Sequence, residues 1–308
     1  MILITEFMNE KAVNLLRSKY DVIYDKSLAD NQEKIPDMMK DIKAIIVRNR
    51  TQINENLLNH SPNLLCVGRL GVGLDNIDLE SCKERNLTVY PATGANTNGV
   101  VEYVLTSALV LLRGAFNKSE EMVSGKWPRE QSSGNEITGK VLGLVGFGEI
   151  AQKTADLARS FNMEIMAFDP FLDKKSSAWN NVENVGLEKL LKGSDVISIH
   201  TPLSESTHHL INSTNLNFMK KTAVIINAAR GGVIDDKALS EKLRKDEIKG
   251  AALDVFETEP MDVNSGSYFH GLKNVILTPH IAGVTEESNV NVSAMIADKI
   301  DQHLSSSI

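Results

Sequence analysis

The chain is poor in cysteine and aromatic residues, contains no long hydrophobic run and carries no excess of positive charge. Two cysteines among 308 residues, without paired spacing, exclude a disulfide framework. A net charge of −7 argues against a nucleic-acid-binding face, which would be basic. The most hydrophobic helical stretch, residues 100–112, contains Glu102 and is too short to cross a membrane. What remains is the composition of an ordinary globular protein, with 42% hydrophobic and 24% charged residues.

Three further features bear on localisation, redox state and metal binding. The first five residues lead directly to Glu6 without the basic and apolar segments of a signal peptide, so we expect a cytoplasmic protein. Cys66 and Cys82 lie in an apolar and a helical stretch and are expected to be reduced, packed thiols. The pairs His208-His209 and Asp235-Asp236 lack converging partners at strand ends, so we expect them at the surface and predict no metal site.

Short apolar runs alternate with helix-length amphipathic stretches along most of the chain. This alternation is typical of β-α-β units and predicts an α/β fold with parallel sheets. The runs fall into two series, one before residue 100 and one from residue 141, which suggests two domains. We expect strands at residues 2–5, 22–24, 44–47, 64–67 and 88–90, then from 141 and at 165–168, 196–199, 223–226, 251–255 and 275–277.

Two long helices and one loop complete this outline. Residues 100–118 predict a helix, and residues 124–129, which include Trp127, predict an exposed loop. A final helix at residues 286–304 is apolar at Val290, Ala294, Ile296 and Ala297, so it needs a surface to cover.

A glycine-rich turn follows the first strand of the second series. In residues 141–151, Gly146 permits a sharp turn and Gly148 lets a pyrophosphate approach the backbone closely. The helix that starts at Glu149-Ile150 offers free N–H groups to that anion. Asp169 ends the next apolar run about 20 residues later, where it suits the ribose hydroxyls of NAD and would repel the extra phosphate of NADP. We therefore predict an NAD site.

Polar residues follow several other predicted strands, at the sheet edge where open parallel sheets bind ligands. Arg48-Asn49-Arg50 offers guanidinium groups, and Gly71-Val72-Gly73 lies in a loop rich in backbone donors; both suit an oxyanion. Arg230, Glu259 and His280 follow three successive strands of the second series. We expect these three side chains along one edge of one sheet.

Together these motifs resemble the D-isomer-specific 2-hydroxyacid dehydrogenase family, and most closely its phosphoglycerate-oxidising members. The resemblance covers essentially the whole chain and implies two Rossmann-like, doubly wound parallel-sheet domains. It places an NAD-binding domain at residues 98–283, inserted into a discontinuous substrate domain of residues 1–97 and 284–308, on which the final helix packs. The motifs that carry it are residues 68–78, the glycine turn, and residues 200–203, 227–233, 253–256 and 278–280.

The resemblance implies catalytic roles for Arg230, Glu259 and His280, and the chemistry suits them. Oxidation of a 2-hydroxy acid needs a base for the hydroxyl proton while hydride leaves the same carbon, and His280 can act as that base near neutral pH. Glu259 would orient the imidazole, and Arg230 would hold the substrate carboxylate through two hydrogen bonds.

The resemblance also implies binding roles and a homodimer. Asp254 would contact the nicotinamide carboxamide, and Thr201 with Pro202 would line the adenosine. Ala228, Arg230 and His280 complete the implied cofactor contacts, and Asn96, at the hinge, joins the substrate contacts. The helix at residues 100–118 and the Trp127 loop would form the dimer interface; a local packing role is the alternative for Trp127.

The identity of the substrate depends on the arginine loop. Arg48 and Arg50 predict an anionic group at the far end of the substrate. The first candidate is 3-phosphoglycerate, oxidised to 3-phosphohydroxypyruvate. Asn49, where phosphoglycerate enzymes often carry serine, and the hinge residues 91–96 depart from that pattern, so sulfolactate is an alternative and hydroxypyruvate or glyoxylate a third.

Two expectations concern regulation and protein class. Because the sequence ends at Ile308, we expect no C-terminal regulatory domain and no feedback by serine. An NAD(H)-sensing binding protein is the alternative from another class, but the complete set of Arg230, Glu259 and His280 argues for an enzyme.

Overall fold

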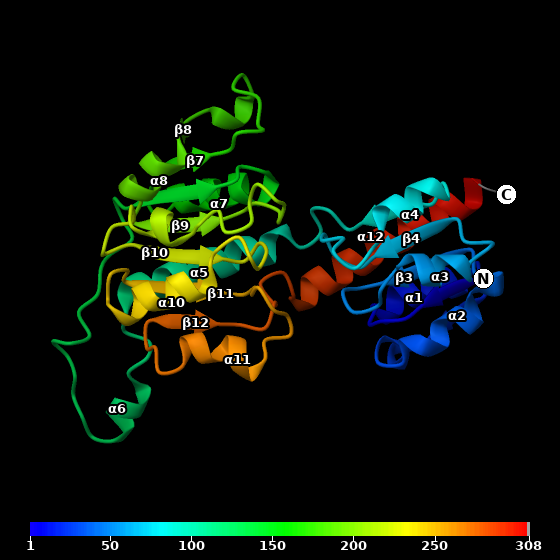
Figure 1. Ribbon diagram of the computed structural model, residues 1–308, viewed down its shortest axis with the longest axis horizontal. Helices are drawn as coiled ribbons and strands as arrows, with labels where there is room; N and C mark the ends of the chain where they lie inside the picture. Colours follow the sequence, from blue (N-terminus) through cyan, green and yellow to red (C-terminus); the bar gives the residue numbers. More distant parts are fainter. Residues whose placement is uncertain (307–308) are drawn as a thin grey trace. The chain divides into compact units, whose positions relative to one another are not determined.

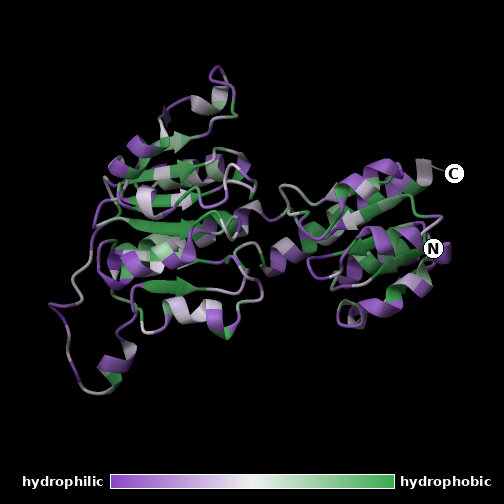
Figure 2. Ribbon diagram, viewed as in Figure 1, coloured by the Kyte–Doolittle hydropathy of each residue, from purple (hydrophilic) through white to green (hydrophobic). Residues whose placement is uncertain are grey.

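The computed structural model describes residues 1–306 and divides into two compact units, each built on a parallel sheet (Figure 1). The first unit contains Met1–Asn96 and the C-terminal segment that begins at Val284, and the second unit contains Thr97–Gly283. The predicted α/β class with two Rossmann-like parallel sheets is confirmed. In both units the strands are mostly hydrophobic and the surrounding helices carry hydrophilic residues, as Figure 2 shows.

The first unit has five strands in the order β2-β1-β3-β4-β5, all parallel. Hydrophobic clusters cover both faces of this sheet. Cys66 and Cys82 are both free and buried, as predicted. The strands are β1 (Ile2–Ile4), β2 (Val22–Tyr24), β3 (Ala44–Val47), β4 (Cys66–Arg69) and β5 (Thr88–Pro91), and the helices between them are α1 (Glu10–Arg17), α2 (Ile35–Met38), α3 (Glu55–Asn59) and α4 (Leu79–Glu84).

The C-terminal helix α12 (Glu286–Ser306) packs on this sheet, so the predicted need for a surface is met. A Cβ atom on Gly68 of β4 would lie 2.6 Å from Ile296 and 3.3 Å from Ile300, so only glycine allows the helix this close to the strand. The predicted apolar face was partly wrong. Val290 and Ala294 are exposed, because the buried stripe runs through Val292, Ile296 and Ile300 at four-residue intervals.

The second unit has seven parallel strands in the order β12-β11-β10-β9-β6-β7-β8. The strand order reverses between β6 and β9, which pair directly, and such a switch point is where open α/β sheets bind ligands. The strands are β6 (Val141–Val145), β7 (Glu164–Phe168), β8 (Glu183–Asn184), β9 (Val196–Ile199), β10 (Val224–Asn227), β11 (Gly250–Leu253) and β12 (Val275–Leu277). The helices are α5 (Thr97–Arg113), α6 (Ser119–Val123), α7 (Glu149–Arg159), α8 (Leu187–Gly193), α9 (Ser213–Leu216), α10 (Asp236–Arg244) and α11 (Val263–Gly266).

Helix α5 differs from the predicted helix at residues 100–118. It ends at Arg113 because Gly114 adopts a left-handed conformation with φ +64° and its N–H donates to the Val110 carbonyl. The short helix α6 follows separately, and residues 124–129 form the exposed loop that was predicted.

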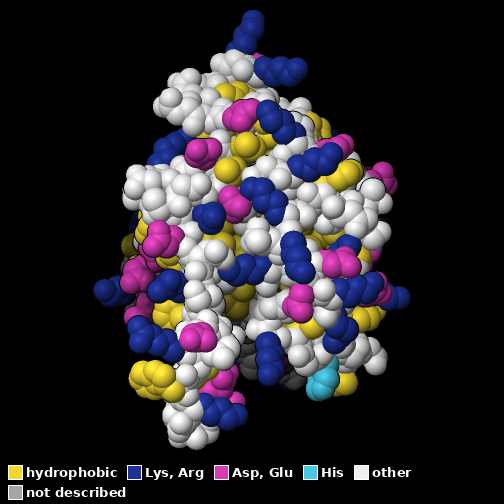
Figure 3. Space-filling view, turned by 90° about the vertical axis from the view of Figure 1, so that its left-hand side faces the viewer, with side chains coloured by type: hydrophobic (Ala, Val, Ile, Leu, Met, Phe, Trp, Pro, Cys, Tyr) yellow, Lys and Arg dark blue, Asp and Glu magenta, His cyan; other side chains and the backbone are white. Residues whose placement is uncertain are grey.

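The charged surface of the second unit is mixed. On the face drawn in Figure 3, Lys and Arg side chains lie scattered among Asp and Glu side chains, as on an ordinary solvated surface. Within residues 1–306, none of the helices combines the length and apolar character needed to cross a membrane.

Candidate active site

The glycine turn between β6 and α7 has the geometry of an anion site. Gly146 has φ +89°, and a Cβ atom there would lie 2.7 Å from the His200 carbonyl oxygen, so glycine is required. A Cβ atom on Gly148 would meet nothing within 4 Å, so the space beside the turn is open. Gly148 caps α7 without a side-chain hydrogen bond, which leaves the N–H groups of Glu149 and Ile150 for a ligand.

Asp169, at the end of β7, is tied to this turn. Its Oδ2 accepts a hydrogen bond of 2.9 Å from the Phe147 N–H, and its Oδ1 accepts from the N–H groups of Phe171 and Leu172 at 2.9 and 3.0 Å. The carboxylate is therefore fixed beside the glycine turn. It remains half-buried and retains acceptor capacity, because two carboxylate oxygens offer about four lone-pair sites.

The loop after β9 lies against the glycine turn. A Cβ atom on Gly146 would lie 3.0 Å from the Thr201 Cγ2 atom. The buried Thr201 hydroxyl has no hydrogen-bond partner among the residues described, and Pro202 beside it is exposed. Ala228, after β10, is half-buried. An orphaned hydroxyl, an open glycine turn and a fixed acid are together suited to a dinucleotide.

His280 and Glu259 form a hydrogen-bonded pair. The Glu259 Oε2 and His280 Nδ1 atoms are 2.7 Å apart, and Glu259 Oε1 accepts a hydrogen bond of 2.9 Å from the Phe256 N–H. Burial acts to raise the pKa of Glu259, but the hydrogen bonds from His280 and Phe256 and the charges of His280 and Arg230 outweigh it, so the pKa lies below its ordinary value. The imidazole is 47% exposed, which leaves its Nε2 edge for proton exchange with a ligand.

Asp254 holds the turn that presents His280. His280 has φ +56°, an uncommon conformation for a residue with a side chain, and its N–H donates to the Asp254 carbonyl at 2.9 Å. The buried Asp254 carboxylate accepts from the Thr278 hydroxyl at 2.6 Å and from the N–H groups of the two residues after His280 at 2.8 and 2.7 Å. The Tyr103 hydroxyl of α5 extends this chain, 2.7 Å from Thr278 Oγ1. Asp254 thus has a structural role that its sequence motif did not reveal.

Arg230 lies in the loop after β10, close enough to Glu259 for its charge to lower the pKa of that carboxyl group. The loop is fixed by Asn227, whose Nδ2 donates to the Arg230 carbonyl at 2.9 Å and whose Oδ1 accepts from the Ala229 N–H at 3.1 Å. The structure therefore brings together Arg230, Glu259 and His280 from the ends of β10, β11 and β12.

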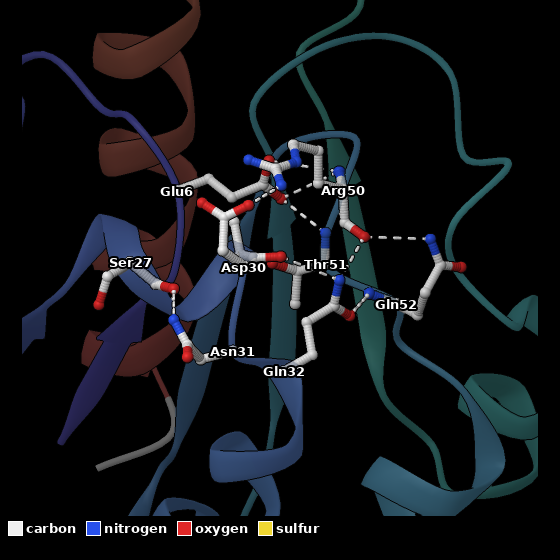
Figure 4. Close-up of polar contacts among 9 residues, drawn as sticks. Glu6, Ser27, Asp30, Asn31, Gln32, Arg50, Thr51 and Gln52 are labelled. Atoms are coloured by element: carbon white, nitrogen blue, oxygen red, sulfur yellow. Dashed lines mark hydrogen bonds and ion pairs between the residues drawn. The ribbon is translucent and has the colours of Figure 1, made fainter. Parts of the chain in front are cut away.

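In the first unit, Glu6 organises the arginine loop (Figure 4). Its buried carboxylate accepts hydrogen bonds from the backbone N–H groups of Arg48, Arg50 and Thr51, the shortest being 2.8 Å. The two arginine side chains differ. Arg50 is exposed and forms an ion pair with Asp30, whereas Arg48 donates to the Asn289 Oδ1 at 2.9 Å. Burial lowers the pKa of Arg48, and the Glu6 carboxylate opposes that shift.

Arg69, at the end of β4, is a candidate that the sequence reasoning missed. Its guanidinium crosses the glycine loop so closely that a Cβ atom on Gly71 would lie 1.6 Å from Nη1. Val72 and Gly73 are half-buried beside it. The buried Asn96 Oδ1 has no partner within residues 1–306. The rule that polar residues follow strands could have found Arg69, because it ends a strand adjacent to the one before Arg48.

The pairs His208-His209 and Asp235-Asp236 were predicted to lie at the surface, and one of their residues does not. His208 is exposed and His209 half-buried, but Asp236 is only 7% exposed, so its assignment to the surface was wrong. The cause is contact with the loop after β11, where the Glu257 N–H donates to Asp236 Oδ2. No group of three or more metal-ligating side chains suited to a metal ion occurs among residues 1–306.

Comparisons with known proteins are consistent with this geometry. A family model of the D-isomer specific 2-hydroxyacid dehydrogenase NAD binding domain matches residues 105–282. An (S)-sulfolactate dehydrogenase of Chromohalobacter salexigens is 45% identical over 304 residues, which cover 98% of each chain. A D-3-phosphoglycerate dehydrogenase of Methanocaldococcus jannaschii is 35% identical over 98% of this chain, which spans 57% of that relative. The crystal structure of the TT0316 protein from Thermus thermophilus matches with a TM-score of 0.90 at 28% identity, covering 99% of this chain and 97% of that one.

Proposed function

This chain belongs to the D-isomer specific 2-hydroxyacid dehydrogenase family, and we propose that within this family it oxidises sulfolactate to the corresponding 2-oxo acid. The reaction class follows from the family: an NAD-dependent dehydrogenase of small 2-hydroxy acids. The observation that supports a substrate with a distal anionic group is Arg48. Its half-buried guanidinium is hydrogen-bonded to a neutral amide, Asn289, and so can accept an anionic group from a ligand.

The proposed mechanism assigns one task to each side chain at the ends of β10, β11 and β12. His280 accepts the hydroxyl proton through Nε2, while Glu259 holds Nδ1 and compensates the positive charge that forms on the ring. Arg230 binds the substrate carboxylate and fixes the orientation of the reacting carbon. NAD held by the glycine turn and Asp169 would supply the hydride acceptor for that carbon.

Cofactor binding is proposed at the switch point of the second sheet. The pyrophosphate would lie on the N–H groups at Gly148, Glu149 and Ile150, beside the open space at the glycine turn. Asp169 would bind the ribose hydroxyls. The orphaned Thr201 hydroxyl supports a polar contact there, with Pro202 and Ala228 as neighbouring apolar surface.

Within the first unit, anion contacts are proposed at the arginine loop and the glycine loop. Arg48 would contact the distal anion, and the backbone of Gly71, Val72 and Gly73 would add N–H donors. Arg69 and Asn96 join this set because one guanidinium lies across the glycine loop and one buried amide oxygen lacks a partner in the described part of the chain. Arg50 contributes less, since Asp30 already balances its charge.

A second candidate is 3-phosphoglycerate, the first candidate that the sequence motifs indicate. It is favoured by the 35% identity to a D-3-phosphoglycerate dehydrogenase. Sulfolactate is now preferred because the (S)-sulfolactate dehydrogenase is more similar, at 45%, and matches over nearly the full length of both chains. Sulfonate and phosphate both accept charge-assisted hydrogen bonds from guanidinium, so Arg48 serves either substrate.

A substrate panel tests the proposal. NADH formation is followed with both enantiomers of sulfolactate, 3-phosphoglycerate, malate, glycerate and lactate. We expect one sulfolactate enantiomer to give the highest kcat/KM, exceeding lactate by about tenfold or more, because one charge-assisted hydrogen bond contributes about 1.5 kcal/mol. Preference for 3-phosphoglycerate would identify that acid as the substrate in place of sulfolactate, and the role of Arg48 in binding the distal anion would be unchanged. Activity with glycerate and lactate equal to that with sulfolactate and 3-phosphoglycerate would refute a distal anion site.

We also propose a homodimer formed through α5 and the segment around α6. Three large apolar side chains of this segment are strongly exposed: Phe116 at 68%, Val123 at 89% and Trp127 at 75%. Such clustered exposure is typical of a covered interface. Sedimentation should give a dimer for the native chain and a shift to monomer for Trp127→Ser combined with Val123→Ser. A monomeric native chain at micromolar concentration would refute the proposal.

A further inference from the structure

Glu257 contacts one member of each of the pairs His208-His209 and Asp235-Asp236, to which no function has been assigned so far. Its Oε1 is 2.7 Å from His209 Nε2. The Glu257 N–H donates to Asp236 Oδ2 at 3.3 Å, and the Asp236 N–H donates back to Glu257 Oε1 at 3.4 Å. These contacts connect the loop after β9, the start of α10 and the loop after β11. We call His209, Asp236 and Glu257 the Glu257 cluster.

The cluster lies next to the Glu259–His280 pair along the chain. Glu257 follows Phe256, whose N–H donates to Glu259 Oε1 at 2.9 Å. This N–H belongs to the preceding peptide, which shares the Phe256 Cα atom with the Phe256–Glu257 peptide, so a displacement of the Phe256–Glu257 peptide would also shift the donor that holds one oxygen of Glu259. The other oxygen, Oε2, is the atom that contacts His280 Nδ1.

The same peptide packs against the loop that carries Arg230. A Cβ atom on Gly231 would lie 1.7 Å from the Phe256 carbonyl oxygen and 2.9 Å from the Glu257 nitrogen. His209 is tied to this loop as well, because its N–H donates to the Gly232 carbonyl at 2.7 Å. The Phe256–Glu257 peptide thus belongs to the loop that supplies the Glu259 side chain and contacts the loop that supplies the Arg230 side chain.

The Asp236 carboxyl group of the cluster is shifted toward its neutral form. Burial raises the pKa of Asp236 to about 7; the negative charges of Glu257 and Asp235 add to the rise, while a hydrogen bond from the Glu257 N–H and the charge of His209 oppose it. A fraction of the Asp236 carboxyl groups is therefore protonated at neutral pH, which limits repulsion with Glu257. His209 is 34% exposed and supplies the opposite charge when protonated.

We propose that Glu257 is a positioning residue, held by His209 and Asp236, that fixes the Phe256–Pro260 segment so that Glu259 meets His280. Glu257 acts through the peptide next to it and contacts neither substrate nor cofactor. The inference rests on the roles proposed above for Glu259 and His280. It assigns Glu257 a role in the reaction in addition to the roles proposed for Arg230, Glu259 and His280.

The test compares Glu257→Ala with Glu257→Gln, using the panel acid that the native enzyme oxidises fastest. Alanine removes every side-chain contact, and we expect kcat to fall about ten- to hundredfold, the cost of displacing a catalytic group by about 1 Å. The KM for NAD should stay within about twofold, since the glycine turn is untouched. Glutamine keeps an oxygen acceptor for both neighbours and should restore kcat to within about threefold of the native value. Glu241→Ala, an exposed acid of α10, is the matched control and should leave kcat unchanged.

The pH profile separates positioning from a general loss of structure. In Glu257→Ala the acidic limb of kcat/KM should shift in the same direction as in Glu259→Gln, because both variants weaken the contact to His280 Nδ1. Should Glu257→Ala fail to fold, His209→Phe keeps a ring but removes Nε2, and kcat should fall about threefold or more. If Glu259→Gln lowers kcat while Glu257→Ala, or His209→Phe in its place, stays within twofold of the native enzyme, the inference is wrong and the proposed function stands. If Glu259→Gln itself has no effect, the proposed catalytic roles fail first.

Discussion

Replacing His280 with alanine should lower kcat for hydroxy-acid oxidation by about 10²- to 10⁴-fold, the range for loss of a general base. The hydroxyl proton would then have no acceptor at the end of β12, because Glu259 is engaged by the Phe256 N–H and lies on the far side of the imidazole. NADH affinity, measured by fluorescence titration, should remain within about twofold, since the glycine turn and Asp169 are unchanged.

The appropriate control is His60→Ala, which removes an exposed histidine of the first unit bonded to its own helix. It should keep native turnover. Near-native turnover of His280→Ala would contradict the assignment of the base. An NAD(H)-sensing binding protein would behave differently again: the native chain would bind NADH and oxidise no acid of the panel.

Replacing Arg230 with glutamine should lower kcat/KM for the hydroxy acid by about 100-fold. The substrate carboxylate loses a bidentate partner, and a hydrogen bond to a charged group contributes up to about 3 kcal/mol. Arg230→Lys keeps the charge without the planar fork, so it should recover part of the loss. Initial rates over a range of acid concentrations measure both variants.

Arg17→Gln, at an exposed position of α1, controls for a change in net charge and should leave kcat/KM unchanged. A decrease of less than about threefold in Arg230→Gln, or an effect confined to the KM for NAD, would remove Arg230 from the substrate site.

Several elements could be predicted from sequence because their signals are local. The strands at Val22–Tyr24, Val196–Ile199 and Val275–Leu277 have the bounds that their apolar runs indicated. Strand β8 was missed because Glu183 and Asn184 are polar and exposed at a sheet edge. The helix predicted to end at residue 118 was too long, because the residues after Gly114 still have a helical composition. The left-handed backbone conformation of Gly114 ends helix α5 at Arg113.

The site was predictable to the extent that its residues follow strands. That rule placed Arg230, Glu259 and His280 at one sheet edge, and the 2.7 Å contact between Glu259 and His280 agrees with the proposed cooperation of these two. It could not find Glu6 or Glu257, because their partners lie 21 to 48 residues away in the chain. For the same reason the burial of Asp236 was missed: the loop after β11 creates it.

We propose that this dehydrogenase selects a hydroxy acid with a distal anion, and the ratio of kcat/KM for sulfolactate to that for lactate tests this selectivity most directly. The proposed contact to Arg48 predicts a ratio of about ten or more for one sulfolactate enantiomer at neutral pH and physiological ionic strength. A ratio near one for both enantiomers, with 3-phosphoglycerate no better than glycerate, would contradict the claim. The Arg48 loop would then have another role, while the Arg230, Glu259 and His280 assignments would still be tested by their own variants.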